Sequence, residues 1–248
     1  MATEVPATST TTSGAFSLET RGIEIVDEGE RKGRPRDLFW PWFAANVSVL
    51  GIAYGAFILA FGVSFWQGVF AAVVGTAFSF LLVGFVALSG KSASVPTMIV
   101  SRAPFGVRGN ALPTAVSYVL LVGWETALTA LATLATATVF DRLGVGGGNA
   151  TKIIAFLVVA AVVVAAGVLG FDVILRLQLI LTIALGVLTV VYIALTAKDV
   201  HWDVVSALPG GSGQAVLGAL VFAMTALGLG WVNAGGDYSR YLPRSASG

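Results

Sequence analysis

Cysteine is absent from this sequence of 248 residues, and histidine occurs once. A chain without cysteine can form no disulfide, no thiolate nucleophile and no cysteine-ligated metal site. Charged residues are also scarce, at 11% of the chain, whereas soluble domains carry about 25%. The formal net charge of +1 gives no positive excess of the kind that binds nucleic acid. The sequence therefore predicts neither a soluble domain nor a nucleic-acid-binding protein.

Long apolar stretches take the place of the missing charge, and 56% of the residues are hydrophobic. Each stretch has about the 20 residues that a helix needs to cross a bilayer. Helices satisfy their own backbone polar groups in lipid, and these runs lack the alternation of barrel strands. We therefore expect an all-α membrane protein. Its six transmembrane helices are predicted at residues 38–63, 65–89, 113–140, 151–169, 174–197 and 213–235.

The placement of basic residues predicts the orientation of these helices. With the N-terminus in the cytoplasm, eleven of the fourteen Lys and Arg residues fall in inner segments. The outer segments hold Arg142, Lys152 and Lys198. Because basic segments stay on the inner side, we expect a multi-pass plasma-membrane protein with a cytoplasmic N-terminus. No short apolar segment precedes the first run, so a cleaved signal peptide is not expected.

Two segments lie outside the apolar runs. Residues 1–37 are expected to form a cytoplasmic tail, disordered at first and densely charged from residue 21 onward. Residues 38–244 are expected to form the transmembrane domain. Within it, residues 90–112 are too apolar for a simple loop and too polar for another span, so they predict an interfacial or partly re-entrant segment.

Trp124 and Glu125 lie in the middle of the third apolar run. A carboxylate in a membrane is costly unless it is paired, protonated or facing water. We expect Glu125 to face a midplane cavity and to accept substrate N–H groups or a coupling proton; a hydrogen bond to a neighbouring helix is the structural alternative. Trp124 lies too deep for the interfacial belt of tryptophans, and its flat face suits stacking on a heterocycle.

The first run contains small and polar residues, among them Ala45, Asn46 and Ser48. Close helix packing would account for them. A break in the helix would account for them as well, because it frees carbonyl groups for a cation and N–H groups for a ligand. On this second interpretation, Ala45, Asn46 and Ser48 bind the cation, and Asn46 and Ser48 also contact the substrate.

The sixth run is rich in glycine around Trp231 and Asn233. A glycine-rich span in lipid often unwinds beside a cavity, and the first and sixth runs would begin the two halves of an inverted repeat. Asn233 offers a donor and an acceptor that suit a nucleobase edge, although a hydrogen bond between helices is equally consistent with it. The candidate substrate site comprises Trp124, Glu125, Asn46, Ser48, Gly228, Trp231 and Asn233.

Two further polar features lie near the sixth run. Asp237 and Arg240 are three residues apart and are expected to pair with each other at a plain charged end of the span, and a gate-facing role is the alternative. His201 lies in the outer loop before this run and is expected to be solvated.

Four segments are distinctive when taken together: WFAANVSVLGIAYG in the first run, SRAPFGVRGNALP after the second, GWE in the third and GWVNAGGDYSRYLP at the end of the sixth. With them the chain resembles the nucleobase–cation symporter family of cytosine, purine, uracil, allantoin and hydantoin permeases. The likeness extends from about residue 21 to residue 244 and is closest to the cytosine–purine branch.

This resemblance implies two inverted five-helix repeats plus two further helices, with substrate and cation between the repeats. It also implies stacking by Trp124 and a broken first span near Asn46, beside substrate and cation. Relatives often carry asparagine where this chain has Leu128, and others carry an aromatic where it has Gly228, so the substrate stays open. Such permeases usually have twelve spans, so the six here correspond to the front half.

The main hypothesis is import of a nucleobase or a related heterocycle together with a proton or a sodium ion. It needs no cofactor, no catalytic residue and no bound metal. A truncated remnant that cannot transport is the alternative. A membrane enzyme is disfavoured, because no histidine or ligand cluster lies at membrane depth. The expected partners are a small nucleobase-like substrate and the lipid bilayer, and the oligomeric state is left open.

Overall fold

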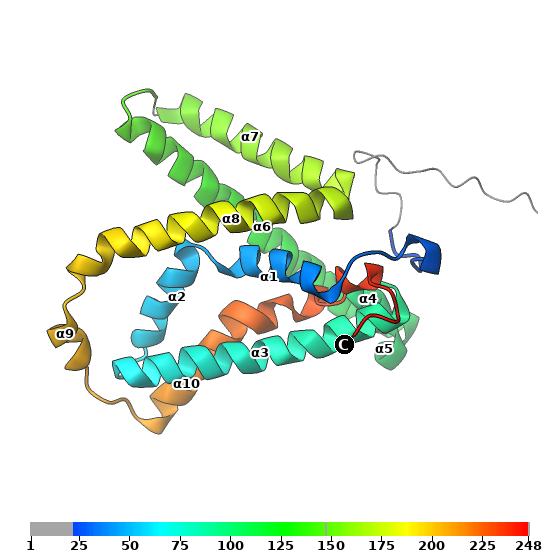
Figure 1. Ribbon diagram of the computed structural model, residues 1–248, viewed down its shortest axis with the longest axis horizontal. Coiled ribbons are helices and arrows are strands. Elements are labelled where there is room, and N and C mark those ends of the chain that lie inside the picture. The colour runs from blue at the N-terminus through cyan, green and yellow to red at the C-terminus, as the bar shows by residue number, and fades with distance from the viewer. Residues whose placement is uncertain (1–21, 147, 248) are drawn as a thin grey trace, which may run out of the picture.

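The computed structural model describes residues 22–146 and 148–247. Their regular structure is entirely helical (Figure 1). Five helices are long and apolar enough to cross a membrane, and a bent pair of helices provides a sixth span if it is counted as one. The prediction of an all-α membrane fold is confirmed.

The unbroken helices follow the predicted runs to within a few residues. Two short helices, α4 and α5, form the segment between the second and third runs, and neither is long enough to cross a membrane. Another short helix, α9, follows the exposed His201. The bounds are α3 Phe65–Ala93, α4 Thr97–Val100, α5 Arg102–Gly109, α6 Ala111–Arg142, α7 Gly148–Leu169, α8 Phe171–Thr196, α9 Trp202–Ser206 and α10 Gly213–Ala223.

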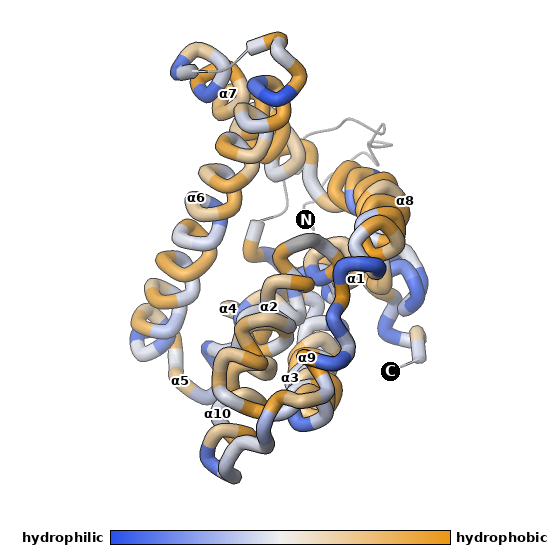
Figure 2. Tube along the Cα trace, turned by 90° about the vertical axis from the view of Figure 1, so that its left-hand side faces the viewer, coloured by the Kyte–Doolittle hydropathy of each residue, from blue (hydrophilic) through white to orange (hydrophobic). Residues whose placement is uncertain are grey.

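Most of the apolar surface of the long helices faces outward. In α6, α7 and α8 only 6% of the most apolar stretch is buried inside the molecule. Figure 2 shows hydrophobic residues along the whole length of these helices. A helix that is apolar on its outer faces needs an apolar solvent, because exposed patches of this size in water cause association. The bilayer supplies that solvent.

The first span is broken in the middle. Helix α1 (Phe39–Asn46) and helix α2 (Val49–Leu59) are joined by Val47 and Ser48. The axes of the two parts differ by 64°. Val47 and Ser48 both have extended backbones, and the Ser48 hydroxyl accepts a hydrogen bond from the Gly51 amide at the start of α2. The break expected in this run is confirmed.

The sixth span also departs from the α-helix. Helix α10 ends at Ala223, and the chain continues as a π-helical segment, Met224–Gly228, and then as a 3-10 helix, Leu229–Ala234. Gly228 lies so close to Ser79 of α3 that a Cβ atom would overlap the serine side chain. The interruption expected in this glycine-rich run is therefore confirmed, and it packs directly on α3.

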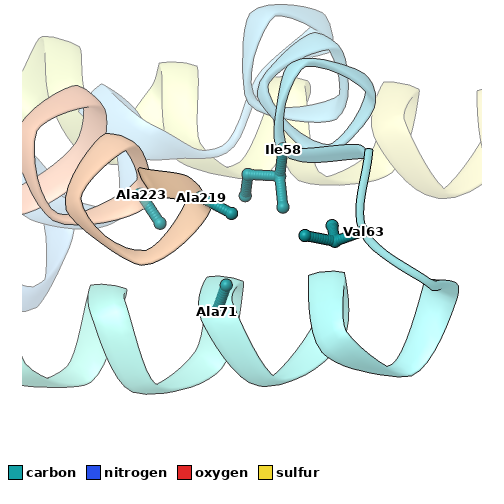
Figure 3. Packing of buried hydrophobic residues seen from close by; sticks show 5 residues of the cluster. All are labelled: Ile58, Val63, Ala71, Ala219 and Ala223. Atoms are coloured by element: carbon teal, nitrogen blue, oxygen red, sulfur yellow. The ribbon is translucent and has the colours of Figure 1, made fainter. Parts of the chain in front are cut away.

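Small side chains bring α2, α3 and α10 close together. Ile58, Val63, Ala71, Ala219 and Ala223 form the buried cluster between them (Figure 3). Because three of these five are alanines, the backbones approach closely, as helices in lipid commonly do. By contrast, α6 and α7 form a hairpin that projects away from this cluster (Figure 1).

The charged tail falls into two parts. Residues 1–21 lie outside the described residues, so the disorder expected there is not addressed. Residues 22–37 pack on the helical bundle, and Val26 is only 2% exposed within a cluster that includes Phe171 and Tyr241. Two short 3-10 helices, Glu28–Glu30 and Pro35–Leu38, lead into α1.

We expect Gly90→Ala to destabilise the fold, because a Cβ there would lie 2.5 Å from the Cα atom and the carbonyl oxygen of Gly236. Two backbones in contact cannot yield as a flexible side chain can, and overpacking of this kind costs about 1–3 kcal/mol. Thermal unfolding in detergent, followed by far-UV circular dichroism, should show a lower melting temperature for this variant.

Gly84→Ala is the matched control on the same helix, since nothing lies within 4 Å of its Cβ position. Alanine there should be neutral or stabilising by up to about 1 kcal/mol through its higher helix propensity. Equal melting temperatures for the two variants would contradict the close packing of α3 on the end of the sixth span.

Candidate functional site

Trp42 joins the first half of the broken span to the end of the sixth span. Its ring meets the ring of Trp231 edge to face at a centroid distance of 6.0 Å, and that of Tyr238 at 5.8 Å. Phe80 of α3 completes the group at 6.3 Å. The sequence interpretation did not single out Trp42, because in an apolar run it resembles any other core aromatic residue.

A second aromatic contact joins the spans on the other side of the break. Tyr54 of α2 meets Phe222 of α10 at 6.2 Å, again edge to face. One contact, Trp42–Trp231, therefore precedes the break at Val47, and the other, Tyr54–Phe222, follows it. The same two contacts lie on either side of the π-helical segment Met224–Gly228 in the sixth span. The first and sixth spans run antiparallel here, and their irregular segments lie at the same level.

The polar side chains at the break cap the helices on either side of it. The Asn46 amide donates to the carbonyl of Trp42 at 2.8 Å, and the Ser48 hydroxyl accepts from the Gly51 amide at 3.4 Å. The last carbonyls of a helix have no partner within that helix. At the end of α1 these include the carbonyls of Ala45 and Asn46. The break thus presents backbone oxygens, which are the ligands that alkali cations use.

Asn233 connects the sixth span to α6. Its amide nitrogen donates to the hydroxyl of Ser117 at 2.8 Å, so the hydrogen bond between helices is the arrangement found. Its carbonyl oxygen is buried and has no hydrogen-bond partner among the described residues. A buried acceptor of this kind favours a ligand that brings a donor.

Trp124 lies on the same face of α6 as Ser117, which bonds to Asn233 of the sixth span. It follows Ser117 by seven residues, which is nearly two full helical turns, so both side chains leave the same face about 10 Å apart. The indole is 44% exposed. A large part of this residue's surface is therefore uncovered.

Glu125 points in another direction. It lines a cavity of about 720 Å³ between α6 and α7, together with Lys152 and a row of threonines. Successive residues on a helix differ by about 100° in direction, and Trp124 is not among the residues lining this cavity. The structure therefore separates the two residues that the sequence interpretation had treated as a pair.

The expected Asp237–Arg240 ion pair is wrong. Asp237 accepts hydrogen bonds from the backbone and hydroxyl of Thr97 at 2.8 and 2.9 Å. The same hydroxyl accepts from the Gly236 amide at 2.9 Å. Arg240 instead donates to the carbonyl of Gly22 and to the hydroxyl of Tyr241. Asp237 therefore ties the end of the sixth span to α4, which follows α3.

Burial raises the pKa of Asp237 above its ordinary value. The hydrogen bonds from Thr97 and the charge of Arg240 act in the opposite direction without cancelling this effect. Burial likewise raises the pKa of the neighbouring Tyr238, and the charge of Asp237 adds to that shift.

The connector between α3 and α6 is organised by Asn110, which is 3% exposed. Its side-chain oxygen accepts from the Ser101 hydroxyl at 2.6 Å, and its amide donates to the carbonyl of Met98 and the hydroxyl of Thr114. The distinctive SRAPFGVRGNALP segment thus fixes the entry into α6, which carries Trp124.

A family model described as "Permease for cytosine/purines, uracil, thiamine, allantoin" matches residues 25–248. The chain is 27% identical to "Putative purine-cytosine permease YxlA" of Bacillus subtilis, over 92% of this chain and 48% of that protein. It is also 23% and 22% identical to two purine-cytosine permeases of Saccharomyces cerevisiae, over 94% and 95% of this chain and 44% of each relative. The chain therefore spans less than half the length of these relatives. No solved structure matches it.

Asp237→Asn should change the pH dependence of stability. Because the pKa is higher in the folded protein than in the unfolded chain, folding favours the protonated form. The stability that this provides is complete below the ordinary value of 3.8 and is lost as the pH rises through the raised pKa. An asparagine at 237 can still accept from Thr97 but has no charge to bury.

The difference in melting temperature, variant minus wild type, should therefore increase between pH 4 and pH 7. Circular dichroism in detergent across this range would measure it. A difference that stays constant, or one that falls with pH, would contradict the assignment of a raised pKa to this carboxyl.

Proposed function

Because this chain belongs to the family of permeases for cytosine/purines, uracil, thiamine and allantoin, we propose that it forms the substrate-binding front half of a secondary transporter. Its substrate is a nucleobase or a related heterocycle such as cytosine, a purine, uracil, allantoin or hydantoin. Import is coupled to a proton or a sodium ion. In this assignment the protein lies in the plasma membrane with its N-terminus in the cytoplasm.

The main support is that the first and sixth spans are interrupted at the same level. Aromatic contacts on both sides of the break bring Val47 and Ser48 beside the π-helical segment Met224–Gly228. Interrupted helices that meet near mid-membrane give transporters backbone groups for an ion and a polar substrate. Aromatic walls around such a position suit a flat ring.

Each candidate residue has a role in this proposal. Trp124 stacks on the heterocycle, and the carbonyl oxygen of Asn233 accepts a hydrogen bond from it. Trp231 forms an aromatic wall of the site, and its edge-to-face contact with Trp42 fixes its position. Gly228 lets α3 pack directly behind the site, because a Cβ there would overlap Ser79, and its backbone contacts the substrate.

The coupling ion has two candidate positions. Ala45, Asn46 and Ser48 would bind a cation through the backbone carbonyls at the end of α1 and the Ser48 hydroxyl. Glu125 would carry a proton in the cavity between α6 and α7, away from the substrate. Neither role involves covalent chemistry, because the ion gradient supplies the free energy of transport.

Uptake of radiolabelled adenine, hypoxanthine, cytosine, uracil and allantoin tests the proposal. The natural protein would be expressed in cells without their own nucleobase permeases, with external sodium and pH varied independently. Saturable uptake of at least one compound, increased by sodium or by acid, is expected. No uptake of any compound would contradict the proposal and favour the alternative of a remnant that cannot transport.

Trp124→Ala should raise the apparent KM for the transported compound by about fivefold or more, because stacking of a base on an aromatic ring contributes about 1–3 kcal/mol. The matched control is Trp66→Ala at the start of α3, where the indole is 75% exposed and far from the breaks in sequence. Equal uptake by both variants would remove Trp124 from the substrate site.

A further inference from the structure

One arginine in the charged N-terminal segment is buried. The side chain of Arg31 is 1% exposed, although five of the six residues that follow it are exposed. A buried guanidinium needs several acceptors, because arginine stays charged under all physiological conditions. The contacts of Arg31 therefore show what this segment is bound to.

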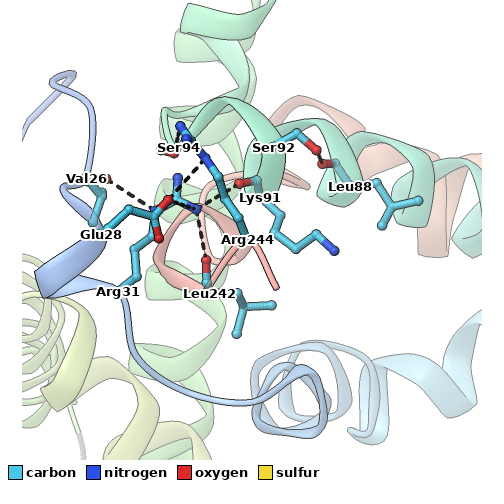
Figure 4. Close-up of polar contacts among 9 residues, drawn as sticks. All are labelled: Val26, Glu28, Arg31, Leu88, Lys91, Ser92, Ser94, Leu242 and Arg244. Carbon is cyan, nitrogen blue, oxygen red and sulfur yellow. Dashed lines mark hydrogen bonds and ion pairs between the residues drawn. The ribbon is translucent and has the colours of Figure 1, made fainter. Parts of the chain in front are cut away.

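The guanidinium of Arg31 connects three parts of the chain (Figure 4). It donates to the carbonyls of Val26, Lys91 and Leu242, each at 3.3 Å. Lys91 lies near the end of α3, and Leu242 follows the sixth span. Glu28 lies 3.5 Å from Arg31 and also 3.3 Å from Arg244. One side chain thus joins the N-terminal segment to the second and sixth spans.

Further bonds attach the same segment along its length. The Val26 amide donates to the carbonyl of Ser94 at 3.0 Å. The Lys32 amide donates to the carbonyl of Tyr241 at 2.8 Å, and the Lys32 ammonium pairs with Asp172, at the start of α8, at 2.6 Å. The segment therefore also reaches the fifth span.

Part of this attachment is weak. All three Arg31 hydrogen bonds are slightly longer than the usual range for N–H···O bonds. One terminal nitrogen of Arg31 is buried without a partner among the described residues, which reduces the net gain from docking. The Lys32–Asp172 pair is about half exposed on both sides, so solvent screens it.

We propose that residues 22–37 act as a latch, with Arg31 as its central contact, and that the latch holds the second, fifth and sixth spans together on the cytoplasmic side. Opening of that side during transport requires its release. The latch thereby controls access from the cytoplasm to the broken spans. This inference rests on the proposed transport function and the proposed orientation.

The 248 residues contain no cysteine, so a single introduced cysteine is the only thiol in this part of the protein and makes the latch directly measurable. Ser94→Cys places a reporter at a fully buried position whose carbonyl binds Val26. Ser92→Cys, two residues earlier and exposed, is the control reporter. The reaction of each with a membrane-impermeant maleimide would be timed in inside-out vesicles containing the whole natural protein.

Arg31→Gln should speed labelling of the Ser94→Cys reporter by about tenfold or more, because it removes the charged hydrogen bonds that join the segment to Lys91 and Leu242. Arg36→Gln removes the same charge from an exposed position of the same segment, and it should change the rate by less than about twofold. The Ser92→Cys reporter should react at one rate in all backgrounds. Equal rates for Arg31→Gln and Arg36→Gln would overturn the latch.

A reporter at the break in the first span, Ser48→Cys, tests control of access. Its labelling from the cytoplasmic side should also accelerate in the Arg31→Gln background. If only the Ser94→Cys reporter responds, the segment docks without controlling access, and the proposal is overturned. Should Arg31→Gln fail to fold, Arg31→Lys replaces it, with an intermediate acceleration expected and an unchanged rate overturning the latch.

Labelling needs no substrate, so these results and the uptake results can fail independently. Uptake without a labelling response would reject the latch and leave the proposed function in place. A labelling response without uptake of any compound would show that the segment docks through Arg31. It would also reject the proposed transport function, and with it the role of the latch.

Discussion

Inside a bilayer every backbone N–H and C=O group needs a partner, and the irregular parts of this chain are organised by that constraint. At the break in the first span, Asn46 and Ser48 cap the two helix ends. In the sixth span the chain changes from α to π and 3-10 helix without becoming extended. The groups left over, namely the carbonyls at the end of α1 and the oxygen of Asn233, are those that a substrate and an ion could satisfy.

Close packing keeps these irregular segments in place. Gly228 contacts Ser79, and Gly236 contacts Gly90, so the end of the sixth span lies directly on the long, regular helix α3. Trp42 then attaches the first span to the sixth. The irregular segments are thus packed on one side against a long, regular helix.

The sequence predicted the parts of the structure that depend on local pattern. Apolar runs located α3, α6, α7 and α8, and small or polar residues located both interruptions. Contacts between distant residues could not be predicted from local pattern. Asp237, for example, binds Thr97, which is 140 positions away, and not the nearby Arg240. Residues 21–37 are densely charged, so the burial of Val26 and Arg31 could not be predicted from them. That burial depends on packing against residues far away in the sequence. Trp124 and Glu125 are adjacent in sequence, but the helical rotation directs them to different surroundings.

On the proposed function, the two interrupted spans meet at a water-accessible site for a flat heterocycle. Hydrogen exchange of the natural protein in lipid nanodiscs, read by mass spectrometry, measures this access at each interruption. Amides at residues 47–49 and 224–234 should exchange much faster than those within Phe65–Ala93, and a bound nucleobase should slow both sets together. Exchange at both interruptions as slow as in α3, and unaffected by every nucleobase, would contradict a water-accessible substrate site between these spans.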